Sequence, residues 1–165
     1  MEVNLCRDAE ASGSLEPDFT QCVWTLETLE ITQQLGQHLA RHLPRGSILL
    51  LQGELGAGKT SLVQGLAQAC GIAEPITSPT FALAQHYPDG NPPLVHLDLY
   101  RLEGAGSADE LFLQEEEEAR AMEALMAVEW PERLRLALPE AWRLELSYLK
   151  TGRRAQLTPP KNAST

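Results

Sequence analysis

The sequence predicts an α/β fold, in which a mainly parallel sheet carries helices on both of its faces. Three short apolar runs, SILLLQ, LVHLDLY and LMAVEW, have the composition of strands that are buried on both faces. Helical segments separate these runs along the chain, and alternation of strands with helices is typical of a parallel sheet. Ligands bind such sheets at the carboxyl ends of the strands, so we expect the functional residues there.

The length and composition predict a single domain. The 165 residues are 43% hydrophobic, which suits one domain with a substantial core. We expect a flexible extension at residues 1–19, the domain at residues 20–158 and a flexible tail at residues 159–165. No apolar run approaches the roughly 20 residues of a membrane span, and the acidic N-terminus lacks the features of a targeting signal. We therefore expect a cytoplasmic protein without membrane partners.

The charge balance is strongly acidic. Thirteen Lys and Arg residues stand against 23 Asp and Glu residues, which gives a formal net charge of -10. Such a charge repels phosphate backbones, so direct binding to nucleic acid is disfavoured. The three cysteines have no metal-type spacing and are odd in number, so neither a disulfide framework nor a cysteine metal site is predicted.

The first half of the domain shows a strand, a helix, a strand and a second helix. These are expected at residues 22–26, 27–43, 47–52 and 60–71. Thr28 is the expected N-cap of the first helix, and Pro44 with Gly46 ends it. Gly71 is the expected stop of the second helix.

The second half continues the alternation. We expect a polar turn leading into a strand at 76–87, a hairpin-type turn at 88–93, a strand at 94–100, a helix at 107–125, and strands at 125–130 and 142–149. Ser107, three residues before Glu110, is the expected cap of that helix. The run Glu115 to Glu118 is interpreted as a solvated helix face, with an acidic patch for a basic partner as the alternative. His96 is expected to be packed in its strand.

Residues 53–60 read GELGAGKT, which is the G-x-x-x-x-G-K-T spacing of a phosphate-binding loop. The glycines let successive backbone N–H groups point at phosphate oxygens, and the following helix adds its positive N-terminal end. Lys59 is expected to neutralise the outer phosphates, and the Thr60 hydroxyl to bind Mg²⁺. The fold class is therefore predicted to be of the P-loop NTPase type.

Two acids are candidates for completing a magnesium site. Asp98 and Glu129 both follow apolar runs, so both carboxylates should emerge at the sheet edge where the loop lies. Composition does not rank them. The SPTF segment at 78–81 has the hydroxyls of a switch loop but equally reads as an ordinary turn. Arg101, Arg153 and Arg154 have the chemistry to stabilise transferred phosphate, although surface arginines are common.

Taken in order, GELGAGKTSL, SPTF, HLDLYRL and VEWPERL resemble the TsaE family, the small ATPases of bacterial tRNA threonylcarbamoyladenosine modification. The likeness covers roughly residues 20 to 158. It implies a P-loop ATPase that binds ATP and Mg²⁺ and does not modify tRNA itself. It also implies that the partners are TsaB and TsaD, that the ATP cycle resets their complex, and that tRNA is reached only through it. The acidic charge agrees with this, because a basic partner surface would be attracted.

The resemblance also implies the roles of the phosphate-loop residues and of the two acids. The residues that would hold the phosphates are Gly56, Ala57, Gly58, Lys59, Thr60 and Ser61. Thr60 and Glu129 would hold magnesium, which favours Glu129 over Asp98 as the metal ligand. Asp98 would then orient the attacking water.

Four more positions match the family pattern. Thr80 of SPTF looks like the family's switch threonine and joins Lys59 and Asp98 in the implied catalytic set. Trp130 belongs to the EWP signature beside the metal acid, and Leu29 and Arg153 fall where the family places nucleotide contacts.

Two other functions use the same loop. A small-molecule kinase would use Asp98 as base and Arg101 on its acceptor, but between Glu103 and Glu123 Arg120 is the only arginine for a lid over ATP. A nucleotide-gated binding module would hydrolyse ATP only as a timer. No N-K-x-D guanine reader is present, which favours ATP.

Overall fold

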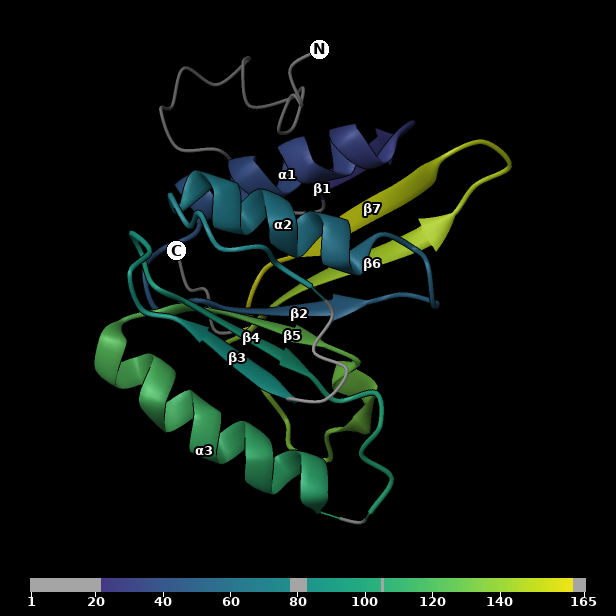
Figure 1. The fold of residues 1–165 in the computed structure, drawn as a ribbon. Helices are drawn as coiled ribbons and strands as arrows, with labels where there is room; N and C mark the ends of the chain where they lie inside the picture. The colour runs from purple at the N-terminus through teal and green to yellow at the C-terminus, as the bar shows by residue number, and fades with distance from the viewer. Residues whose placement is uncertain (1–21, 78–82, 105, 162–165) are drawn as a thin grey trace.

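The computed structural model describes residues 22–77, 83–104 and 106–161, which form one seven-stranded sheet with helices on both faces (Figure 1). The elements are β1 (Cys22–Leu26), α1 (Leu29–His42), β2 (Ile48–Gln52), α2 (Lys59–Ala69), β3 (Ala84–Tyr87), β4 (Leu94–Asp98), α3 (Ser107–Met122), β5 (Leu125–Glu129), the short 3-10 helix η2 (Pro131–Arg133), β6 (Trp142–Tyr148) and β7 (Arg153–Thr158). The strand order across the sheet is β1-β7-β6-β2-β5-β4-β3.

The centre of the sheet is parallel and its edges are antiparallel. β2 pairs in parallel with both β5 and β6, and β4 pairs in parallel with β5. β1, β7 and β3 are added in antiparallel fashion at the two sides. The central strands are buried along nearly their whole length, as their apolar runs predict. The α/β fold class with a largely parallel sheet is thereby confirmed.

Helices α1 and α2 lie together on one face of the sheet, and α3 lies on the other (Figure 1). The alternation along β5 shows how one strand serves both faces. Leu125 and Ala127 belong to the core under α1 and α2, whereas Met126 and Val128 belong to the core under α3. The sheet therefore separates two hydrophobic cores, and the strand that carries Glu129 is buried on both faces and paired on both sides.

Two glycines bring α1 and α2 unusually close together. A Cβ atom added at Gly36 would lie 2.2 Å from the Leu62 carbonyl oxygen, and one added at Gly65 would lie 2.0 Å from the Gln33 carbonyl oxygen. Only glycine therefore fits at this crossing. Because α2 begins directly after the phosphate loop, this packing helps fix the position of the loop.

The predicted ends of the first two helices are confirmed. The Thr28 side chain accepts a hydrogen bond from the Ile31 backbone N–H at 3.2 Å, as an N-cap should. Gly71 follows the end of α2 with φ 74°, the left-handed conformation of a glycine stop. The turn after β3 also joins antiparallel strands, as a hairpin-type turn should.

Two local predictions are wrong, and one strand was not predicted. Ser107 is not a cap: it is the first residue of α3, and Gly106 precedes it in a left-handed conformation without a side-chain bond. Strand β7 is absent from the prediction. Glu115 is not on a solvated face, because it follows Phe112 and precedes Ala119 at helical spacing on the buried side of α3.

The burial of Glu115 is compensated by the edge of the sheet. His86 of β3 lies in contact with the Glu115 carboxylate through Nε2, and its Nδ1 is 3.4 Å from Glu118. An otherwise unpaired carboxylate would be costly to bury, so this contact explains how α3 tolerates an acid in its core-facing stripe. Glu117 and Glu118 are exposed, as predicted.

The predicted extension at 1–19 and residues 162–165 of the predicted tail lie outside the described residues. Residues 159–161 follow β7, and the Lys161 N–H donates to the Pro139 carbonyl at 2.8 Å. The division into one domain with two flexible ends stays a prediction. Of the helices in the described part of the chain, none combines the length and the apolar character of a membrane span.

Candidate functional site

The phosphate loop connects β2 to α2, where the strand ends and the helix begins. Gly56 and Gly58 have φ values of 79° and 107°, in a region that other residues rarely adopt. Gly58 is also the residue before the first turn of α2, so the loop passes directly into N–H groups that have no helical partner. The sequence motif is thus folded as a tight turn, closed by the hydrogen bond from the Ala57 N–H to the Glu54 carbonyl, next to the positive end of a helix.

Lys59 is nearly buried at the start of α2, with 5% of its surface exposed. Its Nζ donates to the Gly53 carbonyl oxygen at 2.5 Å and lies 3.9 Å from the centroid of the Trp130 ring. Burial lowers the pKa of this ammonium group, while the nearby carboxylates of Glu129, Glu132 and Asp98 act in the opposite direction. The lysine is therefore enclosed by a carbonyl and an aromatic face, close to acids on neighbouring strands.

The two candidate acids are side by side. Asp98 at the end of β4 is paired in register with Glu129 at the end of β5. Asp98 Oδ1 accepts a hydrogen bond from the Tyr100 backbone N–H at 3.0 Å. Glu129 is 3% exposed, and its Oε2 lies 2.5 Å from Nε2 of the fully buried His96. The prediction that both acids emerge at the loop edge is borne out by this register.

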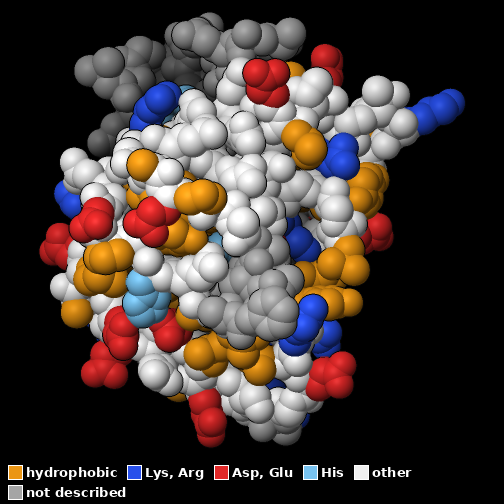
Figure 2. Space-filling view, viewed as in Figure 1, with side chains coloured by type: hydrophobic (Ala, Val, Ile, Leu, Met, Phe, Trp, Pro, Cys, Tyr) orange, Lys and Arg blue, Asp and Glu red, His pale blue; other side chains and the backbone are white. Residues whose placement is uncertain are grey.

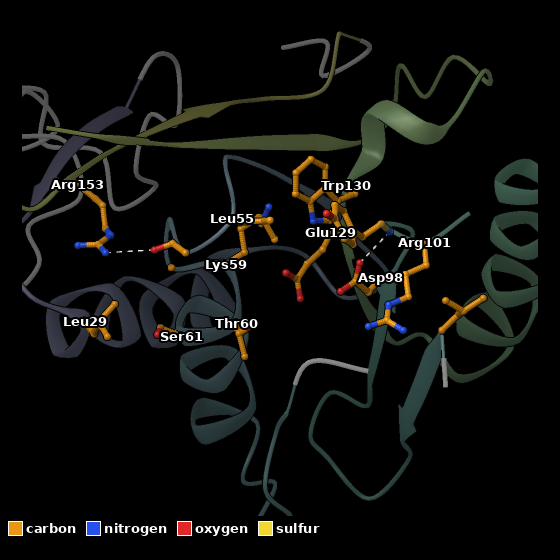
Figure 3. Close-up of a pocket in the computed structure, with 14 residues that line it drawn as sticks. Leu29, Leu55, Lys59, Thr60, Ser61, Asp98, Arg101, Glu129, Trp130 and Arg153 are labelled. Carbon is orange, nitrogen blue, oxygen red and sulfur yellow. Dashed lines mark hydrogen bonds between the residues drawn. The ribbon is translucent and has the colours of Figure 1, made fainter. Parts of the chain in front are cut away.

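A cavity of about 440 Å³ opens between the phosphate loop and these acids (Figure 3). The predicted residues that line it are Leu29, Gly56, Gly58, Lys59, Thr60, Ser61, Asp98, Glu129, Trp130 and Arg153. Ala57 does not line it, because its side chain is fully buried in the core under α1 and α2. Thr80 lies outside the described residues. Figure 3 shows Lys59 and Thr60 on one side of the cavity and Asp98, Glu129 and Trp130 on the other.

The hairpin of β6 and β7 contacts the tip of the loop. β6 is the neighbour of β2 on the side away from β5. The hydroxyl of Tyr148, at the end of β6, donates to the Leu55 carbonyl at 2.7 Å. Arg153, at the start of β7, donates through Nη2 to the Gly56 carbonyl at 3.2 Å, and its guanidinium lies 5.1 Å from the centre of the Tyr148 ring. Arg154, the other arginine considered in this stretch, is exposed. The loop therefore has supports from α2 and from the β6–β7 hairpin.

Sequence reasoning missed four residues of this site. Leu55, Tyr100 and Tyr148 line the cavity or support the loop, and His96 reaches Glu129. Leu55 occupies an unspecified position of the loop motif, and Tyr148 is brought in by a pairing that no local pattern encodes. His96 and Asp98 are alternate residues of β4, and Tyr100 lies in the turn that follows the strand. That spacing was the available signal, since alternate residues share a face.

The site fits a nucleotide with a bound divalent cation. The fit rests on the donor set: backbone N–H groups at a helix start and a lysine for phosphate, with the Thr60 hydroxyl and carboxylate oxygens for a hard cation. Arg101 also lines the cavity. Trp130, with φ 60°, lies beside the lysine, and its ring packs at a 45° tilt against that of Tyr100, with 4.8 Å between the ring centroids.

Comparisons with known proteins agree with one another. Residues 26–156 match the family model described as "Threonylcarbamoyl adenosine biosynthesis protein TsaE". The chain is 50% identical over 112 residues to a protein of Synechocystis sp. named "tRNA threonylcarbamoyladenosine biosynthesis protein TsaE", covering 66% of this chain and 69% of that one. A protein of Nostoc sp. with the same name is 44% identical over 134 residues, covering 79% and 81%. The crystal structure of Bacillus subtilis YdiB superposes with a TM-score of 0.69 at 27% identity, covering 87% of this chain and 88% of YdiB.

Proposed function

Because the chain belongs to the TsaE family of tRNA threonylcarbamoyladenosine biosynthesis proteins, we propose that it is a Mg²⁺-dependent ATPase in this tRNA modification. One observation carries the proposal. A single cavity brings Lys59 and Thr60, at the start of α2, opposite Asp98 and Glu129, at the ends of adjacent strands. Phosphoryl transfer to water needs these parts: a phosphate cradle, a cation site and a group that positions the nucleophile.

The phosphate loop binds the nucleotide in this proposal. Backbone N–H groups between Gly56 and Ser61 donate to phosphate oxygens, and the start of α2 adds its positive end. Lys59 exchanges the Gly53 carbonyl for an outer phosphate oxygen. The exchange replaces a neutral acceptor by an anionic one, which makes the stronger hydrogen bond.

The remaining roles, cation binding and positioning of the water, fall to Thr60 and the two acids. Thr60 and Glu129 hold the cation, and Asp98 orients the attacking water. Bound Mg²⁺ supplies positive charge that neutralises the phosphates during transfer. Asp98 lines the cavity, and its carboxylate is fixed there by the hydrogen bond that Oδ1 accepts from the Tyr100 N–H. Thr80 stays the proposed switch residue of this set.

Three residues at the outer part of the cavity are proposed to contact the rest of the nucleotide. Leu29 is half exposed at the start of α1, and Arg153 crosses over the loop from β7. Trp130 covers the lysine from the side of the acids. Apolar and aromatic surface with one cation suits a purine nucleotide, and ATP is the proposed one.

The partners are proposed from the family. We propose that TsaB and TsaD bind this protein, that its ATP cycle resets their complex in the cytoplasm, and that tRNA is reached only through them. The charge of -10 supports an indirect role, because it opposes contact with RNA phosphates. On the face in Figure 2, acidic side chains gather on the side that carries α3, and Lys and Arg are more frequent towards β6 and β7. Any basic partner surface would be attracted to the acidic side.

The test is phosphate release from MgATP by the protein alone. We expect slow release of inorganic phosphate to water, reduced about 100-fold in Lys59→Ala because an anion-stabilising group is lost. Lys150→Ala, which removes an exposed lysine beyond β6, should leave the rate unchanged.

The same assay separates the kinase alternative. The segment between Glu103 and Glu123 that would supply a kinase lid is α3, packed on the sheet through Phe112 and Ala119. Transfer of phosphate to a small-molecule acceptor in preference to water, or release that survives Lys59→Ala, would contradict the proposed ATPase.

A further inference from the structure

We propose that His96 is a positioning residue for the cation site, acting through Glu129. The imidazole holds one oxygen of the Glu129 carboxylate, so that the other oxygen faces the cavity before a metal arrives. This inference rests on the proposed function, because Glu129 is the metal ligand that it assigns.

The contact is short and fully enclosed. His96 Nε2 lies 2.5 Å from Glu129 Oε2, and the two residues are 0% and 3% exposed. His96 is paired in register with Ala127, two residues before Glu129, so both side chains lie on the same face of adjacent strands. The pairing of the two central strands holds both backbones in place.

The ring has one described hydrogen bond, and it is to Glu129. Nδ1 of His96 is buried without a hydrogen-bond partner among the described residues. A carboxylate oxygen only accepts, so the ring proton in this contact lies on Nε2 and the imidazole donates. His96 therefore supplies a fixed donor at one lone-pair site of Glu129 and leaves the second oxygen to other partners.

The contact between His96 and Glu129 matters because Lys59 lies near the same carboxylate. Burial lowers the pKa of the lysine and the nearby Glu129 carboxylate partly opposes this, yet no ion pair within the described part of the chain joins the two. A glutamate has three side-chain torsions, and without His96 it would be free to turn toward the ammonium group. Holding the carboxylate in advance removes that competitor and its ordering cost, as outer-shell partners do for metal ligands.

The test is the effect of Mg²⁺ on nucleotide affinity, measured without turnover. The Kd of the non-hydrolysable analogue AMP-PNP is determined in excess Mg²⁺ and in EDTA, and their ratio is the gain due to the cation. We expect His96→Leu to reduce this gain about tenfold while leaving the Kd in EDTA near the wild-type value. Leu94→Val, on the same face of β4, controls for a loosened core.

Two amide variants remove the objection that an apolar residue disturbs folding. The nitrogen of His96→Gln reaches the position of Nε2, whereas that of His96→Asn reaches only that of Nδ1. We expect the gain from Mg²⁺ to be retained in the first and lost in the second. A purely structural role would make the two amides equivalent.

A double variant tests whether His96 acts through Glu129. If His96 acts through Glu129, the double variant His96→Asn/Glu129→Gln should lose no more of the affinity gain from Mg²⁺ than Glu129→Gln alone. Full additivity of the two losses, or an undiminished gain in His96→Asn, would overturn the inference. Failure of the proposed function gives a different result: wild type would show no gain from Mg²⁺ at all, and Lys59→Ala would bind AMP-PNP as well as wild type.

Discussion

At the scale of a single residue, Lys59 is a buried cation whose ammonium group contacts two neutral groups. Its ammonium is held by the Gly53 carbonyl and the Trp130 ring, and burial lowers its pKa. Each of these neutral contacts can be given up for an anionic phosphate oxygen at a gain. The role of Lys59 was predicted from the loop motif alone. Its contact with Trp130 was not, because it depends on the end of β5 lying beside the start of α2.

His38 gives a prediction about pH at the same scale. Burial, together with the adjacent charges of His42 and Arg41, lowers the pKa of His38 from 6.5 to about 4 in the folded protein. As the pH falls below 6.5 the unfolded chain binds this proton first, so stability is full above that pH and declines toward pH 4.

The measurement is urea unfolding at pH 7 and pH 5. The free energy of unfolding should fall over this interval in wild type, and fall less in His38→Leu. Gln34→Leu, a similar change on α1 without a titratable group, should keep the wild-type dependence. An unchanged pH dependence in His38→Leu would show that other groups cause the loss.

At the scale of elements, prediction succeeded where the signal was local. The central strands β2, β4 and β5 were predicted from apolar runs, and α1 from its cap and spacing. Strand β7 was missed because it carries Arg153 and Arg154 and is a strand only through pairing with β1 and β6. The start of α3 at Ser107 was predicted, but its cap was misassigned, because a left-handed Gly106 and not the Ser107 side chain precedes the helix.

The crossing of α1 and α2 gives the prediction for elements. Gly65→Ala in an isolated helix would stabilise it by up to about 1 kcal/mol, but here the new methyl would meet the Gln33 carbonyl at 2.0 Å. We expect a net loss of about 3 kcal/mol in the free energy of unfolding, typical of overpacking at its upper end.

Chemical unfolding of the variant measures this loss. Gln68→Ala, on the exposed side of the same helix, removes only the exposed hydrogen bond from Gln37 of α1 and adds no atom at the crossing, so it should cost no more than about 1 kcal/mol. A Gly65→Ala protein as stable as wild type would mean that the two helices can separate without cost, and that their packing does not fix the phosphate loop.

At the scale of the whole molecule, the site exists because three elements end at one edge of the sheet. β2 delivers the phosphate loop, and β4 and β5 deliver the acids in register. The order of apolar runs was enough to predict that Asp98 and Glu129 would meet there. It did not rank them, because both reach the same cavity. The different roles proposed for the two acids rest on the family resemblance.

The surface that would bind the proposed partners is the feature of the molecule that the sequence predicts least. Complementarity to another protein depends on side chains drawn together from many elements, and no spacing rule encodes it. The net charge restricts only the sign of a favoured partner surface. The proposed role with TsaB and TsaD is therefore tested with those proteins present.

The most direct measurement is the rate of phosphate release from MgATP with and without the TsaB and TsaD counterparts. The account predicts a low rate alone, a clear increase when the pair is added, and loss of that increase in Lys59→Ala. Asp98→Asn should still bind the pair but allow only one round of its reaction. A rate that the pair leaves unchanged, with no complex formed, would contradict the account.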